Sequence, residues 1–231
     1  MSITDRIKRT SAEAPVYAKF CVYGQSGTGK TTLAATLPKP FVISAEGGLL
    51  SLRGADIPYV EIKTIDEMRE AFVFLSSPDA AHIESVVIDS ISEIAEIVLS
   101  TEKARTVNGK PIDPRQAYGA TQEAVVAMIR AFSGLPKHLL ILAKCEKTQD
   151  EAGRLLYQPA MVGQKLGQQL PYMFDFLFAL RNEKDADGQI VRYLQTRTDG
   201  LWQAKERGGF VDAVELPDLS AIIAKITNSG V

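Results

Sequence analysis

Nine consecutive residues near the start of the chain have the types and spacing of a phosphate-binding loop. They follow an apolar run at 16–23 that is typical of a strand, and they lead into a helical pattern at 30–37 that ends before Pro38. Glycine at three positions permits backbone angles that turn successive N–H groups toward phosphate oxygens. The loop predicted to bind a nucleoside triphosphate consists of Gly24, Gln25, Ser26, Gly27, Thr28, Gly29, Lys30, Thr31 and Thr32.

Two side chains of this loop and one distant acid are predicted to bind the phosphates and Mg²⁺. Lys30 is expected to reach the β- and γ-phosphates, and the Thr31 hydroxyl is expected to ligate Mg²⁺. Residues 85–89 form an apolar strand that ends in Asp89, so the carboxylate should reach the same sheet edge and hold Mg²⁺ through water. The alternative is an aspartate that only caps the following helix.

A second acid, Glu46, follows the predicted strand at 40–44. A carboxylate just past the end of an adjacent strand could polarise a water molecule in line with the γ-phosphate, so we expect Glu46 to be the general base. The alternative is a loop glutamate that faces solvent, because surface loops are rich in such residues.

Two cations near the C-terminus, Lys205 and Arg207, are one residue apart on a strand-like segment and should point to the same side. A cation supplied to the γ-phosphate neutralises charge that develops during transfer, an effect worth ~10³ to 10⁵ in rate for arginine fingers. Hydrolysis would then require assembly of several copies. A solvated basic turn is the alternative.

Other polar residues give weaker signals. Lys144 and Glu146 follow an apolar strand at 138–143, where they either sense phosphate or simply end the strand. Trp202 is expected to pack rather than to stack on a base. The two histidines have no cysteine or histidine partner at ligand spacing, so they predict no metal site.

Length and composition limit the class of protein. A chain of 231 residues with 45% hydrophobic residues can bury one substantial core, so we expect an N-terminal arm at 1–15 and a single domain at 16–231. A net charge of −2 excludes a globally basic nucleic-acid binder. The charged N-terminus, the two isolated cysteines and the absence of a long apolar run predict a cytoplasmic protein without a membrane partner.

Strand and helix patterns alternate along the first half of the chain, which predicts an α/β fold with a mostly parallel central sheet flanked by helices. A loop is expected at 106–116 and a helix at 119–133. Turn residues at 150–153 and 185–188 predict hairpins that add antiparallel strands at the C-terminal side of the sheet. A last short helix is expected to start at Pro217 and Asp218.

The order of the phosphate loop, Ala45-Glu46 and Val87-Ile88-Asp89-Ser90 resembles the RecA-like ATPase core, most closely that of phage ATPases of the Sak-type single-strand annealing group. The resemblance covers about 17–210. It implies ATP and Mg²⁺ as cofactors, Glu46 as the catalytic glutamate and Asp89 as the magnesium-binding aspartate. Lys205 and Arg207 resemble the Lys-x-Arg element that ring and filament members project into a neighbouring subunit's nucleotide.

The resemblance also implies two DNA-facing loops, here at about 101–118 and 147–165. Cations and aromatic rings in such loops suit single-stranded DNA, and a ring or filament would multiply the small excess of positive charge. Ordinary solvated loops are the alternative. The predicted DNA-binding residues are Lys103, Arg105, Lys110, Arg115, Lys147, Arg154 and Lys165.

Taken together, the residues and the resemblance predict a RecA-like phage recombination protein in the cytoplasm of a bacterial host. It is expected to bind and slowly hydrolyse ATP, to assemble, and to bind and anneal single-stranded DNA, with a single-strand DNA-binding protein as a further partner. Two alternatives stay open: a small-molecule nucleotide kinase, although no arginine-rich lid is evident, and a non-hydrolysing nucleotide-gated DNA-binding scaffold.

Overall fold

The computed structural model describes residues 2, 4, 16–149 and 153–228. The predicted N-terminal arm lies outside these residues except for positions 2 and 4, and the predicted turn at 150–153 lies outside them except for Gly153. No helix in the described part of the chain is long and apolar enough to cross a membrane.

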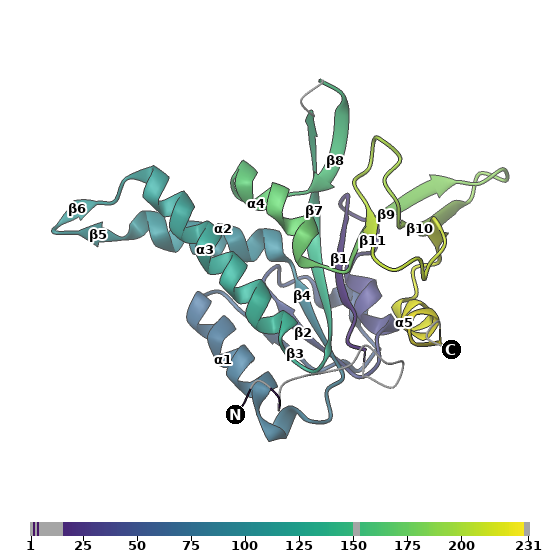
Figure 1. The fold of residues 1–231 in the computed structure, drawn as a ribbon, viewed down its shortest axis with the longest axis horizontal. Coiled ribbons are helices and arrows are strands. Elements are labelled where there is room, and N and C mark those ends of the chain that lie inside the picture. The colour runs from purple at the N-terminus through teal and green to yellow at the C-terminus, as the bar shows by residue number, and fades with distance from the viewer. Residues whose placement is uncertain (1, 3, 5–15, 150–152, 229–231) are drawn as a thin grey trace.

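A ten-stranded sheet crosses the described part of the molecule, in the order β12-β10-β9-β1-β7-β4-β2-β3, with β11 added on β9 and β8 on β7 (Figure 1). The strands from β9 to β3 in this order are parallel, and β10, β11, β12 and β8 are antiparallel to their neighbours. This arrangement confirms the predicted α/β class with a mostly parallel central sheet and antiparallel strands at the C-terminal side. The strands are β1 (Lys19–Gly24), β2 (Pro40–Ser44), β3 (Tyr59–Glu61), β4 (Ser85–Asp89), β7 (His138–Gln149), β8 (Leu155–Pro159), β9 (Phe176–Lys184), β10 (Ile190–Gln195), β11 (Lys205–Glu206) and β12 (Val214–Glu215).

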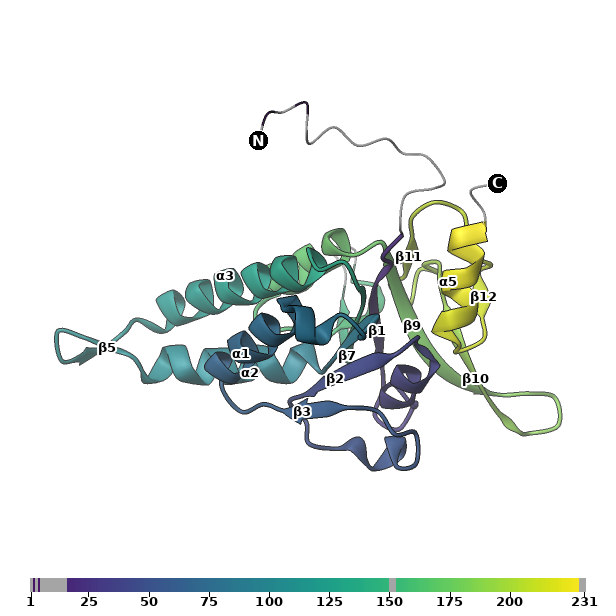
Figure 2. The same cartoon turned by 90° about the horizontal axis from the view of Figure 1, so that it is seen from below.

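Helices cover both faces of this sheet (Figure 2). One face packs against α1, α2 and α3, and the other against the short helix after β1 and the C-terminal helix α5. The helices are α1 (Ile65–Ser76), α2 (Ile91–Ala104), α3 (Pro114–Ser133), α4 (Gln164–Gln169) and α5 (Leu219–Asn228), with 3₁₀ turns η2 (Thr31–Thr36), η3 (Leu49–Leu52), η4 (Pro78–Ala80) and η5 (Leu170–Met173).

The central strand β1 shows why two covered faces follow from the sequence. Cys21 and Tyr23 pack into the core beneath α1, α2 and α3, whereas Phe20 and Val22 pack into the core beneath α5. Side chains alternate between the faces of a strand, so an uninterrupted apolar run places hydrophobic groups on both. The strand therefore has to be central, and its carboxyl end delivers the phosphate loop to the middle of one sheet edge.

Capping and turn residues set the start of α1 and the β9–β10 hairpin. Thr64 and Glu67 form a capping box at the start of α1. The predicted hairpin between β9 and β10 is confirmed, with the Asp185 N–H donating to the Gln189 carbonyl at 2.9 Å. The C-terminal helix is also confirmed and begins at Leu219.

The predicted loop at 106–116 is wrong in detail. It contains a small two-stranded hairpin, β5 (Thr106–Val107) with β6 (Lys110–Pro111), and α3 already begins at Pro114. The Asp113 carboxylate accepts from the Arg115 N–H, and proline at the first helical position costs no hydrogen bond, so the helix starts earlier than its apolar pattern. Helices α2 and α3 with this hairpin form an arm that projects from the body of the molecule (Figure 1).

The antiparallel pairing of β7 with β8 agrees with the predicted hairpin, and β7 continues to Gln149, so the segment predicted to face DNA at 147–165 includes parts of two strands and the start of α4. One further expectation needs correction. The helix after the phosphate loop is a 3₁₀ helix of 6 residues. A helix this short and tightly wound aligns few peptide dipoles, so its contribution to phosphate binding is smaller than that of a full α-helix.

Candidate nucleotide-binding site

The phosphate loop lies where the parallel strands end. Gly27 and Gly29 have φ angles of 78° and 89°, in the left-handed region that favours glycine. Gly24 is required for a different reason, since a Cβ atom there would lie 2.6 Å from the Leu180 carbonyl oxygen of β9. Two of the three glycines thus supply conformation, and the third allows a neighbouring strand to approach.

Lys30 folds back over its own loop. Its Nζ donates to the carbonyl oxygens of Gly24 at 2.9 Å and Gln25 at 3.0 Å. Burial lowers the pKa of Lys30, and the nearby carboxylates of Glu46 and Asp89 act in the opposite direction. The ammonium is therefore held inside the curve of the loop, close to two acids, where a phosphate chain could replace the two carbonyl partners.

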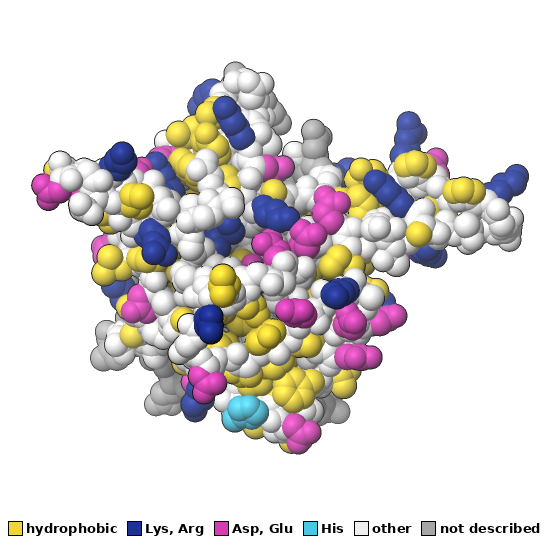
Figure 3. All heavy atoms as spheres, turned by 180° about the vertical axis from the view of Figure 1, so that it is seen from behind, with side chains coloured by type: hydrophobic (Ala, Val, Ile, Leu, Met, Phe, Trp, Pro, Cys, Tyr) yellow, Lys and Arg dark blue, Asp and Glu magenta, His cyan; other side chains and the backbone are white. Residues whose placement is uncertain are grey.

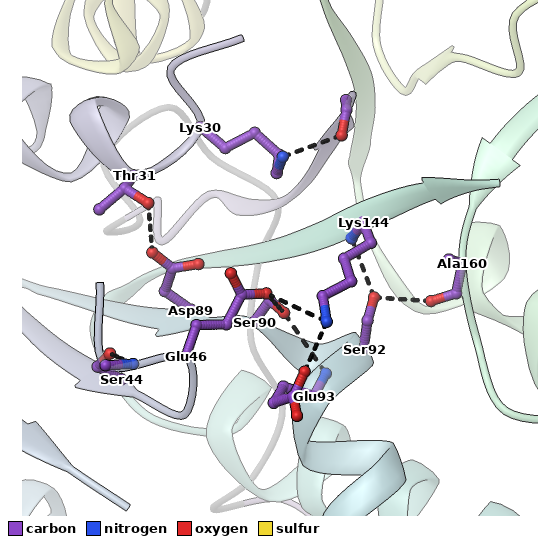
Figure 4. A network of polar contacts seen from close by, with 12 residues as sticks. Lys30, Thr31, Ser44, Glu46, Asp89, Ser90, Ser92, Glu93, Lys144 and Ala160 are labelled. Atoms are coloured by element: carbon purple, nitrogen blue, oxygen red, sulfur yellow. Dashed lines mark hydrogen bonds and ion pairs between the residues drawn. The ribbon is translucent and has the colours of Figure 1, made fainter. Parts of the chain in front are cut away.

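Thr31 and Asp89 meet at the edge of the sheet (Figure 4). The Thr31 hydroxyl donates to Asp89 Oδ2 at 2.6 Å, and Asp89 is 4% exposed. Burial raises the pKa of Asp89, the Thr31 hydrogen bond lowers it, and the charge of Glu46 raises it. A hydroxyl and a carboxylate in contact are oxygen donors of the kind that Mg²⁺ prefers, so the residues present fit that ion.

Glu46 lies beside Asp89 after the end of β2 (Figure 4). The Ser90 hydroxyl donates to Glu46 Oε1 at 2.5 Å, and Lys144 Nζ lies 3.9 Å from the same oxygen. The Ser44 hydroxyl accepts from the Gly47 N–H at 3.1 Å, which shapes the turn that carries the glutamate. The carboxylate is thus oriented toward the edge where the phosphate loop lies and is partly open to solvent.

Lys144 belongs to this network, although the sequence alone left open whether it senses phosphate or simply ends its strand. In the sheet it lies opposite Gly24, directly beside the loop. Its Nζ pairs with Glu93 Oε2 at 2.5 Å, a hydrogen bond that raises the pKa of Lys144. The Ser92 hydroxyl accepts from the Lys144 N–H and donates to the Ala160 carbonyl, which joins β7 to the segment after β8.

Ser90 and Glu93 were missed as site residues from the sequence alone. Both follow Asp89 at the start of α2, where Ser90 is also the N-cap and accepts from the Glu93 N–H at 3.4 Å. The signal was the N-cap serine itself: a capping side chain that follows an acid at a strand end is placed at the same sheet edge. The peptide bond between Asp89 and Ser90 is cis.

The predicted finger residues lie elsewhere on the molecule. Lys205 is in β11, opposite Leu177 near the amino end of β9, and its Nζ donates to the carbonyls of Pro171 at 2.7 Å and Phe174 at 3.0 Å. Arg207 is exposed, with a terminal nitrogen 3.4 Å from Asp175. Because β9 runs parallel to β1, this end of β9 is remote from the phosphate loop of the same chain. Their role as a finger directed at a neighbouring subunit's nucleotide stays a prediction.

The predicted DNA-contacting cations divide between the arm and the region around the β7–β8 hairpin. On the arm, Lys103 lies 5.2 Å from the centre of the Tyr118 ring, and Arg105 pairs with Glu102 at 2.6 Å. Trp202 stacks on Tyr157 with ring centres 4.3 Å apart and is 8% exposed, in accord with a packing role. The remaining cations are Lys110 in β6, Arg115 in α3, Lys147 in β7, Arg154 before β8 and Lys165 in α4.

Residues 17–208 match a family model described as AAA domain. No curated protein matches the chain. Among solved structures, the chain is similar to a KaiC-like protein from the hyperthermophilic archaeon Pyrococcus horikoshii, with 14% identity, a TM-score of 0.48, and coverage of 83% of this chain and 89% of that one.

A prototypical ATPase of the type III secretion system of pathogenic bacteria is also similar, with 12% identity and a TM-score of 0.42. The match covers 71% of this chain and 51% of that one. The family model spans most of the chain, including the phosphate loop, Glu46 and Asp89. The chain therefore belongs to the AAA domain family of P-loop ATPases.

Proposed function

We propose that the protein is a phage recombination ATPase that assembles into a ring or filament in the cytoplasm of a bacterial host. In this proposal it uses magnesium-dependent ATP binding and hydrolysis to control the binding and annealing of single-stranded DNA, together with a single-strand DNA-binding protein. Hydrolysis is slow until DNA or a neighbouring subunit completes the site.

The chemistry follows from the side chains at the sheet edge. Glu46 takes a proton from a water molecule whose oxygen bonds to the γ-phosphorus, the bond to the bridging oxygen breaks, and ADP leaves. Lys30 neutralises negative charge on the phosphates. Thr31 and Asp89 would hold magnesium, which supplies positive charge to the phosphate oxygens.

The observation that carries the catalytic part is the position of Glu46, held by the Ser90 hydroxyl at 2.5 Å and next to Asp89. The Glu46→Gln variant keeps this hydrogen-bond acceptor and removes the base. We expect its turnover to fall ~10²- to 10⁴-fold, with an unchanged dissociation constant for ATP. Glu61→Gln, at the end of the neighbouring strand β3, is the matched control and should turn over normally. Unchanged turnover in Glu46→Gln would remove Glu46 from the mechanism.

The DNA-binding part is supported by how the basic segments join the site. Helix α2 begins beside Asp89 and leads into the arm, and β7 passes Lys144 before it enters the β7–β8 hairpin. Figure 3 shows Lys and Arg side chains along the projecting arm. Both basic segments are therefore continuous with elements that carry site residues, which supports nucleotide control of DNA binding.

A salt titration of single-stranded DNA binding, with a non-hydrolysable ATP analogue present, tests this part. Several phosphate contacts predict a steep loss of affinity with added salt. The double variant Lys110→Ala/Arg115→Ala should bind more weakly and with a shallower salt slope than wild type. Lys63→Ala/Arg69→Ala, at the α1 side, removes the same charge and should behave like wild type. Binding that is undetectable at low salt would contradict the DNA-binding role.

Assembly and the finger can be tested by mixing two inactive variants. Glu46→Gln retains Arg207, and Arg207→Ala retains Glu46, so a mixed oligomer contains interfaces at which both groups are present. We expect the mixture to recover part of the wild-type turnover and each variant alone to remain inactive. Normal turnover of Arg207→Ala at every protein concentration would exclude a role in trans.

Radiolabelled ATP distinguishes an ATPase from a nucleotide kinase. Hydrolysis yields free labelled phosphate, whereas a kinase transfers the label to a nucleoside acceptor.

A further inference from the structure

A second hairpin leaves the carboxyl edge of the sheet on the other side of β1. It is formed by β9 and β10, in which Arg192 lies opposite Asn182. A Cβ atom on Gly29 would overlap a terminal nitrogen of Arg192 and would lie 3.4 Å from its Cζ and 3.2 Å from the Thr32 hydroxyl oxygen. The Arg192 guanidinium thus lies against the phosphate loop of its own chain, and glycine at position 29 leaves room for it.

The two arginines of this hairpin differ in their partners. Arg181 forms ion pairs with Glu183 and Asp199 and donates to Gln195. Within residues 16–149 and 153–228, the Arg192 side chain has neither an ion pair nor a hydrogen bond. An unpaired guanidinium beside the phosphate loop is a cation positioned for a bound anion, and its planar donors suit phosphate oxygens.

The strand order indicates which part of a nucleotide Arg192 would meet. Asp89 and Glu46 lie on the β4 and β2 side of β1, whereas Arg192 lies on the β9 and β10 side. Thr31 faces Asp89, and its neighbour Thr32 lies near Arg192. A phosphate chain with its reacting end at the carboxylates therefore has its nucleoside end toward Arg192.

We infer that Arg192 binds the α- and β-phosphates of the nucleotide, in cis, and so contributes to the affinity for ATP and ADP alike. The inference rests on the nucleotide site proposed above and gives it a second cation besides Lys30. It assigns Arg192 a different task from Arg207, which would act from a neighbouring subunit on the γ-phosphate. Arg192 is thereby a binding residue that does not take part in the cleavage step.

The experiment measures dissociation constants for ADP and for a non-hydrolysable ATP analogue, with Mg²⁺, on the full chain. Loss of a charged hydrogen-bond donor predicts about 10-fold to 100-fold weaker binding of both nucleotides by Arg192→Ala. Arg192→Lys, which keeps a positive charge at this position, should recover part of the affinity. Lys184→Ala, on the same face of the hairpin and farther from the loop, removes one positive charge and should bind like wild type.

The possible outcomes separate the two levels of the proposal. If wild type binds neither nucleotide, the nucleotide site itself is wrong. If wild type binds both and Arg192→Ala binds them equally well, only the assignment of Arg192 is wrong. Weaker binding of the ATP analogue alone would also overturn it, because that result places the guanidinium at the γ-phosphate. An equal loss of nucleotide affinity in Lys184→Ala would show that the effect depends on overall positive charge and not on a contact made by Arg192, and it would also overturn the assignment. Circular dichroism checks that each variant is folded.

Discussion

Lysines lie at both the amino end and the carboxyl end of the parallel strands, and burial lowers the pKa of Lys19, Lys30 and Lys137. Their ammonium groups nevertheless have different partners. At the amino edge, Lys137 donates to the carbonyls of Ala80 and Ile83, and Lys19 donates to those of Leu135 and Lys137, so each ammonium joins segments far apart in the chain. At the carboxyl edge, Lys30 donates to carbonyls of its own loop. The first kind of bond holds the fold together, and the second can be exchanged for a ligand.

This contrast separates structural from functional lysines without reference to any motif. Removing an ammonium that links distant segments leaves buried carbonyls without donors, which costs stability. Removing one that only spans its own loop leaves the fold intact and removes charge from the site. The predictions below test this division, beginning with the largest expected effect.

Lys30→Ala should lower ATP turnover by ~10³, because it removes the ammonium expected to neutralise charge on the transferred phosphate. The free energy of unfolding without nucleotide should stay within about 1 kcal/mol of wild type, because a partly buried cation is costly to keep. Steady-state phosphate release and urea unfolding measure the two quantities. Turnover above a tenth of the wild-type rate would contradict the assignment.

Lys137→Met should do the reverse. The side chain is 6% exposed and its Nζ lies 2.8 Å from the Ala80 carbonyl and 2.6 Å from that of Ile83. Methionine fills similar space but leaves both carbonyls unpaired, so the free energy of unfolding should fall by about 2 to 4 kcal/mol. Turnover per folded molecule should not change. A variant as stable as wild type would show that the two bonds contribute little.

Lys144→Ala tests a lysine whose partners are carboxylates. It removes the ion pair with Glu93 and the nearest cation to Glu46. We expect turnover to change by about 10-fold or less and stability by under about 1 kcal/mol, because the pair is half exposed. The Ser92 hydrogen bond to the main chain of residue 144 remains as an internal control for the position of β7. A large loss of stability would place Lys144 among the structural lysines.

The smallest effect concerns pH. Burial lowers the pKa of Lys19 to about 8, below its usual 10.5. Between these values the unfolded chain binds more protons, so the Lys19 contribution to stability increases as pH rises from 8 to 10.5. The full shift would correspond to about 3 kcal/mol. Because Lys19 is only partly buried, solvent screening reduces this value, and we expect wild type to gain about 1 kcal/mol relative to Lys19→Met across this window, measured by urea unfolding at both ends. Parallel pH profiles for the two proteins would show that the ammonium is not desolvated.

Local signals predicted most of the fold. The apolar runs of β1 and β4, the capping box of α1 and the turn residues after β9 act within a few residues, so they can be read from the sequence. The phosphate loop and the acids Glu46 and Asp89 were found in the same way, because each directly follows a strand. The 3₁₀ form of η2 was missed, and so was the early start of α3, although the signals for α3 are local: Asp113 as N-cap and Pro114 at the first helical position.

Contacts between distant strands could not be predicted. Lys144 reaches Glu93 only because β7 lies between β1 and β4, and Arg192 reaches Gly29 only because β10 pairs with β9 in one register. A shift of that register by one residue would turn Arg192 to the opposite face of the hairpin. The sequence shows that these cations are present, but the order of the strands determines which of them lie beside the phosphate loop.

The hydrogen bond from Ser90 to Glu46 has a mechanical consequence. Ser90 is the N-cap of α2, and the 14 residues of this helix extend about 21 Å toward the β5–β6 tip. A tilt of about 5° at the Ser90 end would move the tip by about 2 Å, because a helix of this length behaves as a stiff rod. A rotation of α2 at its contact with Glu46 would thus be transmitted to the far end of the arm as a larger displacement.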